Sequence, residues 1–190
     1  LPNEESVNEL SKVLIENLLE FNESSTNSTT KFFSDAVEGL MGGMIWKLKT
    51  SYPQYCTLPH LIAIFQSMTT KQLVTFVSSN ITSRSMASAF INGMDSDKQT
   101  AGVKSTLANA FKKIGSQQLF MALSKDEVPL NINSKDNPAV ICIVNHPKYE
   151  SAYSPIIAAI MHTVIKQMSV RGQQSSFLMM EEAPTLKLLN

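Results

Sequence analysis

Two adjacent carboxylates, Glu181 and Glu182, follow an apolar run near the end of the chain. The run covers residues 177–180, and an unbroken apolar run is typical of a strand covered on both faces, as in a parallel sheet. Acidic residues at the carboxyl end of such a strand lie where open α/β sheets bind ligands. This pattern resembles the Walker B motif of nucleotide hydrolases, and it fits equally well a buried strand that ends in solvated acids.

In the nucleotide-hydrolase interpretation, Glu182 is the candidate general base, and Glu181 binds Mg²⁺ directly or through water. His146 follows a second apolar run at residues 139–144, so we expect it at the same sheet edge, within reach of a nucleotide. Nucleotide hydrolysis also needs a phosphate-binding loop of the type Gly-x-x-x-x-Gly-Lys-Ser/Thr, and the 190 residues contain none. Either the site is not for a nucleotide, or the loop lies upstream of Leu1.

The elements that would position these residues form a strand, a helical crossover and a second strand. The crossover helix is expected from about residue 153 to residue 168, and such a unit predicts parallel pairing. Before it, residues 31–123 show helical periodicity with short connections, which predicts a compact all-α bundle. Residues 3–21 predict a further amphipathic helix, followed by a polar linker over residues 22–30.

Three glycines, Gly39, Gly42 and Gly43, lie inside one expected helix of the bundle. Each costs about 1 kcal/mol relative to alanine in a helix, so we expect close helix packing to compensate for them. They are not a phosphate-binding loop, because no Gly-Lys-Ser/Thr follows them.

The composition limits the classes of function. Hydrophobic residues make up 43% of the chain, and 16 basic residues balance 16 acidic ones. The summed charge therefore favours neither nucleic acid nor an anionic membrane, although a local basic patch remains compatible with it. The two cysteines, Cys56 and Cys142, match no metal-binding spacing and indicate free thiols in a reducing compartment.

Four basic residues of the predicted bundle are candidates for nucleic-acid binding. The alternative for the same residues is an ordinary solvated helix surface. The candidates are Arg84, Lys104, Lys112 and Lys113.

The order of elements resembles that of the TraG/TraD family, the coupling proteins of conjugation and type IV secretion. Residues 31–43 resemble the aromatic-rich helix that opens the family's all-α insert, and residues 102–111 resemble a later helix of it. Residues 137–157 resemble the return to the motor sheet, and residues 177–186 the Walker B strand. Two departures are Glu181, where the family has Asp, and Lys187, where it has Gly.

The resemblance implies a mixed fold, in which an all-α helical bundle is inserted in a partial α/β RecA-like parallel sheet of the P-loop NTPase type. Residues 1–30 would be the N-terminal helix and linker of the motor domain. Residues 31–127 would be the all-α inserted domain. Residues 128–190 would be a partial motor domain with the βαβ unit and the Walker B strand.

The resemblance also implies a function. The chain would be a fragment of a hexameric ATPase that couples the relaxosome to a type IV secretion channel, with the all-α domain recognising DNA or relaxosome proteins. The full-length protein would use ATP and Mg²⁺ and lie at the cytoplasmic face of the bacterial inner membrane, anchored by an upstream segment. The fragment lacks the Walker A loop, so we expect it to be soluble, monomeric, inactive alone and free of bound cofactor.

The alternative is a non-catalytic DNA- or protein-binding helical module whose acidic strand is purely structural. The sequence leaves open which DNA or protein is transferred and whether DNA contacts the all-α domain directly. It also leaves open whether Glu181, in place of Asp, preserves ATPase activity.

Overall fold

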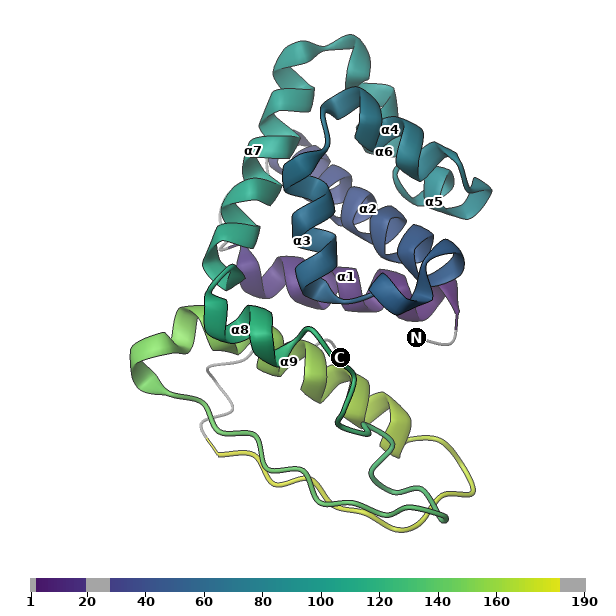
Figure 1. Cartoon of the computed structure of the whole chain (residues 1–190), viewed down its shortest axis with the longest axis vertical. Coiled ribbons are helices and arrows are strands. Elements are labelled where there is room, and N and C mark those ends of the chain that lie inside the picture. The colour runs from purple at the N-terminus through teal and green to yellow at the C-terminus, as the bar shows by residue number, and fades with distance from the viewer. Residues whose placement is uncertain (1–2, 20–27, 182–190) are drawn as a thin grey trace.

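The structure, a computed structural model, describes residues 3–19 and 28–181 of the chain. In these residues the chain forms nine α-helices and no β-strand (Figure 1). The helices are α1 (Glu4–Leu18), α2 (Ser28–Ser51), α3 (Leu58–Ser67), α4 (Thr70–Ser78), α5 (Ile81–Met86), α6 (Ser88–Asn92), α7 (Asp97–Ile114), α8 (Gln117–Ala122) and α9 (Glu150–Met168). Short 3₁₀ helices are η1 (Pro53–Tyr55), η2 (Gly93–Asp95) and η3 (Pro147–Tyr149).

Side-chain caps define where most of these helices begin. Asn3 accepts a hydrogen bond from the Ser6 backbone N–H at the start of α1, and Asn80 does the same for Ser83 in α5. Thr69 and Gln72 form a capping box at α4. These local signals explain why the helical prediction for residues 31–123 is confirmed.

The core is built around α2, which contacts α1, α4, α5, α6 and α7. Its largest fully buried side chains are Leu40, Met41, Met44 and Leu48. The same core includes Val7 of α1 and Ile156 of α9, so it joins helices that the sequence analysis assigned to three different units. The boundaries of those units stay predictions.

Two glycines of α2 allow it to approach α5 closely. A Cβ atom built at Gly39 would overlap the carbonyl oxygen of Met86, and one built at Gly43 would lie 2.7 Å from the carbonyl oxygen of Ser83. Both obstacles are backbone atoms, which cannot rotate away as a side chain can. The predicted close packing around these glycines is therefore confirmed.

The predicted parallel sheet, and with it the mixed α/β RecA-like fold class, is wrong for the described part of the chain. The two apolar runs are instead extended segments, residues 139–145 and residues 174–181, named here the first and second segment. They run in the same direction below α9, which connects them (Figure 1). The predicted βαβ unit is therefore absent from the described residues, where α9 connects two unpaired extended segments instead.

Hydrogen bonds tie the start of the second segment to Asn133, which lies in the loop before the first segment. The Gln174 backbone N–H donates to the Asn133 carbonyl oxygen (3.0 Å), and the Asn133 side-chain amide donates to the Gln174 carbonyl oxygen (3.3 Å). Parallel pairing of strands is less stable per residue than antiparallel pairing, and two paired strands alone are marginally stable. A parallel sheet also needs cover on both faces, whereas α9 covers only one here. These deficits account for the absence of a ladder.

The contact between α1 and α9 includes an ion-pair cluster centred on Glu9. Its carboxylate accepts from Lys166 Nζ at 2.8 Å and lies 3.4 Å from His162 Nε2. The hydrogen bond from Lys166 is the main cause of a pKa lower than the usual 4.5 for Glu9. The cluster therefore stabilises the fold when Glu9 is ionised.

Replacing Glu9 with glutamine is expected to lower the free energy of unfolding at pH 7 by about 0.5–1 kcal/mol, because the pair is partly exposed and screened. A lowered folded-state pKa gives stability that is present above the unfolded pKa and lost as the pH falls through the folded one. The difference between variant and wild type should thus disappear well below pH 4.5. Urea unfolding at pH 7 and pH 3 measures it.

The matched control is Glu16→Gln, which removes an exposed pair with Lys12 that is 3.9 Å long. It should change stability less than Glu9→Gln at pH 7. A Glu9→Gln effect that persists unchanged at pH 3 would contradict the role given to the carboxylate.

Among the helices of residues 3–19 and 28–181, none combines the length and the hydropathy that a membrane span requires.

Candidate functional site

The predicted acidic site is only partly within the described residues. Glu182 lies outside them, and Glu181 is their last residue, with an exposed side chain. Glu181 and Glu150, at the start of α9, line the same open groove of about 900 Å³ between α9 and the two segments. The two segments therefore line one groove, although the expected sheet edge is absent from the described residues.

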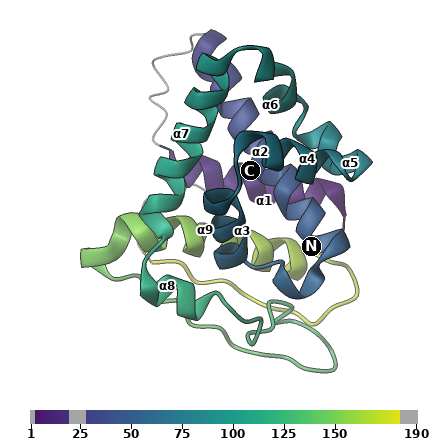
Figure 2. The ribbon, with the colours of Figure 1, turned by 45° about the horizontal axis from the view of Figure 1, so that its top comes forward.

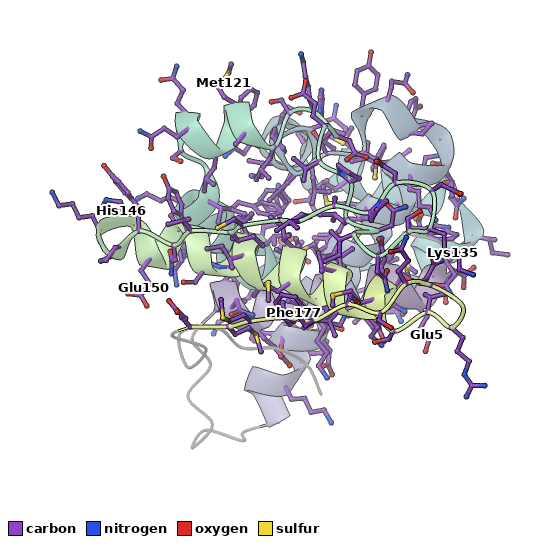
Figure 3. All side chains as sticks on the ribbon, turned by 90° about the horizontal axis from the view of Figure 1, so that it is seen from below. Glu5, Met121, Lys135, His146, Glu150 and Phe177 are labelled. Atoms are coloured by element: carbon purple, nitrogen blue, oxygen red, sulfur yellow. The ribbon has the colours of Figure 1, made fainter. Side chains whose placement is uncertain are left out.

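His146 follows the first segment and is exposed beside α9 (Figure 3). Its ring accepts a hydrogen bond from the Lys148 backbone N–H (3.2 Å) and lies against the Tyr149 ring, with centroids 5.3 Å apart. Nowhere in residues 3–19 and 28–181 do three His, Cys, Asp or Glu side chains gather closely enough to hold a metal ion. The roles of Glu181, Glu182 and His146 stay predictions.

The four basic candidates do not converge on one surface. Lys113 Nζ donates to the carbonyl oxygen of Leu18 at the end of α1 (2.8 Å). Lys104 Nζ donates to the carbonyl oxygen of Met68 at the end of α3 (3.4 Å) and lies over the Phe65 ring. Both lysines therefore neutralise helix carboxyl ends, where cations are favourable. Arg84 and Lys112 are exposed on different helices, α5 and α7.

Three pairs of basic and aromatic side chains lie around the end of α2 and the turn that leads into α3, the backbone of which Figure 2 shows. Lys47 Nζ lies 5.9 Å from the centre of the Tyr52 ring, and Lys49 Nζ lies 4.8 Å from that of Trp46. Beyond the turn, the rings of Tyr55 and His60 are 5.1 Å apart. The α2-end surface is defined by these six residues: Trp46, Lys47, Lys49, Tyr52, Tyr55 and His60.

Local hydrogen bonds hold this turn in place. The Tyr52 backbone N–H donates to the Leu48 carbonyl oxygen (2.8 Å), and the Tyr55 N–H donates to the Tyr52 carbonyl oxygen (2.9 Å). Pro53 fits the first position of η1, where no N–H is needed. Both tyrosines remain nearly half exposed, at 45% and 48% of their surface. The turn therefore presents two aromatic rings to solvent on an ordered backbone.

The Cys56 side chain connects this turn to α2. Its thiol lies 3.8 Å from the Ile45 carbonyl oxygen, and burial raises its pKa, which keeps the thiol neutral at neutral pH. Both cysteines are free, as the sequence predicted.

The distribution of charged residues along the sequence indicates this surface, although the total charge does not. No Asp or Glu occurs between Glu38 and Asp95, whereas this stretch contains Lys47, Lys49, Lys71 and Arg84. The total of 16 acidic and 16 basic residues does not show that one stretch of the chain lacks acidic residues. Charge counted along the chain, rather than in total, identifies residues 39–94 as a basic region.

An acidic groove of about 630 Å³ lies elsewhere on the bundle, between α1, α2 and α5, and its carboxylates come from Glu4, Asp35 and Glu38. Burial raises the pKa of Glu38, and the neighbouring Asp35 and Glu16 carboxylates add to the rise. Such a groove repels a polyanion, so a nucleic acid is confined to other surfaces.

Comparisons with family models, curated proteins and solved structures found no match for this chain.

Proposed function

We propose that this chain is part of a DNA-transfer coupling protein of the TraG/TraD kind, and that its helical part binds single-stranded nucleic acid at the α2-end surface. The observation that carries the proposal is the contact of Lys47 with the exposed Tyr52 ring, in a stretch that contains no carboxylate nearby in sequence. Single-strand binders combine aromatic rings, on which bases stack, with cations that neutralise phosphates.

The residue types of the α2-end surface suit a single strand better than a duplex. Tyr52 and Tyr55 offer ring faces that stack on any base, and such stacking needs bases that are not paired inside a helix. Lys47 and Lys49 already lie close to rings, so their charges are near the places where phosphates adjoin stacked bases. Preference for a single strand follows from this arrangement.

The experiment is a fluorescence-anisotropy titration of a labelled oligodeoxythymidine with the whole chain at several salt concentrations. Each lysine that neutralises a phosphate adds about 0.7 to the salt slope for a single strand, so Lys47→Ala/Lys49→Ala should reduce the slope by roughly 1.4. The control, Lys125→Ala/Lys135→Ala, removes two exposed lysines outside this surface and should leave the slope unchanged. Absence of binding at low salt would contradict the proposal and favour a protein partner.

ATP and Mg²⁺ belong to the proposal only for the longer protein that the resemblance implies. Relaxosome proteins, secretion-channel components and a hexameric assembly are likewise part of the proposed setting.

A further inference from the structure

The two extended segments leave an apolar face uncovered. The most exposed side chains alternate along both segments: Val140 is 98% exposed, Val144 78%, Phe177 87% and Met179 77%. Cys142, between the two valines, is exposed as well. These five residues are named the outer face, and Figure 3 shows Phe177 part-way along the second segment.

We infer that the outer face binds the outer face of a second copy of this chain. The four most exposed side chains leave on the order of 500 Å² of apolar surface in water, which is the size of patch that marks interaction sites. Two copies would bury about 1,000 Å², the area that a specific interface should reach. The outer face contains no charged residue, so two identical faces do not repel each other.

Charges at the two ends of the outer face determine how the copies are oriented. Its amino end has the exposed cations Lys135 and Arg171 beside Asp136, and its carboxyl end has the exposed carboxylates Glu150 and Glu181 beside Lys148. Figure 3 shows Lys135 and Glu150 at opposite ends. An antiparallel two-fold arrangement brings the basic end of one copy to the acidic end of the other.

The same arrangement places the first segment of one copy antiparallel to that of the other. Cys142 is the middle residue of the first segment, so it lies opposite its own counterpart. A short bis-maleimide, which forms a thioether with each thiol, should therefore link two copies through Cys142. Cys142→Ser should abolish this product, whereas Cys56→Ser should not, because Cys56 is half-buried against α2 and is not part of the outer face.

The test is sedimentation velocity of the whole chain from about 1 to 100 μM, together with the cross-linking. We expect a reversible dimer. Phe177→Asp should raise the dissociation constant of the dimer at least tenfold without changing the helical circular dichroism. Met179→Asp is a second variant of the same kind. The control Phe120→Asp changes an exposed aromatic residue on α8 and should still form the dimer.

A chain that is monomeric over this whole range overturns the inference, and so does a dimer that both aspartate variants leave intact. Cross-linking through Cys56 instead of Cys142 also overturns it. The outer face is separate from the α2-end surface, so oligodeoxythymidine binding should be the same for Phe177→Asp and wild type. The two proposals can therefore fail independently.

Discussion

Replacing Gly39 with alanine is expected to destabilise the chain by about 2 kcal/mol or more, although alanine is the better helix former by about 1 kcal/mol. The added methyl group would overlap the Met86 carbonyl oxygen, which is a backbone atom at the end of α5. Helices α2 and α5 would have to separate, and the core side chains between them would lose contact. Urea unfolding followed by circular dichroism measures the change.

Gly42→Ala is the matched control in the same helix. Its new Cβ would lie 3.3 Å from the Ser11 hydroxyl and 3.5 Å from the Asn8 side chain, which are side-chain atoms that can adjust. It gains the same helix propensity, so it should cost much less than Gly39→Ala. Equal stability losses for the two variants would show that α2 and α5 are not in close backbone contact.

The double variant Tyr52→Ala/Tyr55→Ala is expected to weaken binding of oligodeoxythymidine at least 30-fold. Base stacking on an aromatic side chain is worth about 1–3 kcal/mol per base, and about 1.4 kcal/mol corresponds to a factor of ten in affinity. Both rings are already exposed, so the fold should be little affected. Anisotropy titration at constant low salt measures the loss.

Phe120→Ala serves as the control for this loss, because Phe120 is a half-exposed aromatic residue on α8, outside the α2-end surface. Its affinity should equal that of wild type. If the double tyrosine variant binds as tightly as Phe120→Ala, the rings do not stack on bases, and phosphate contacts alone explain any binding.

The sequence predicted the helical part of the fold well because its signals are local. Asn3, Thr57, Thr69 and Ser96 all cap the helices that they precede, so most helix starts could be read from neighbouring residues. Two boundaries differ: α2 begins at Ser28, so the end of the predicted linker is helical, and α9 begins at Glu150 rather than near residue 153. The expected continuation of α1 to residue 21 lies outside the described residues.

The sheet could not be predicted in the same way, because a strand becomes part of a sheet only through partners distant in sequence. The apolar runs at residues 139–144 and 177–180 were predicted as strands, but the structure shows unpaired extended segments there. Their continuous hydrophobicity suggested cover on both faces, but α9 supplies cover on one face only. The outer face is the side on which the sequence predicted cover and the described residues supply none.

The α2-end surface was missed for a related reason. Trp46, Lys49 and Tyr55 are unremarkable as sequence neighbours, and the total charge gave no indication of a basic region. Lys49 contacts Trp46 one helical turn earlier in α2, and only the chain turn after α2 places the Tyr52 ring near Lys47. By contrast, Lys104 and Lys113 looked like a basic face but donate to backbone carbonyl oxygens at helix ends.

The central claim is that single-stranded nucleic acid binds at the carboxyl end of α2, and Trp46 reports on that place directly. It is the only tryptophan of the chain, and it contacts Lys49 within the α2-end surface. One titration with labelled oligodeoxythymidine should read Trp46 fluorescence and oligonucleotide anisotropy in the same sample. We predict saturable quenching of Trp46 with the same midpoint as the anisotropy, reversed by salt. Anisotropy that rises while Trp46 fluorescence stays constant would place the binding elsewhere and contradict the claim.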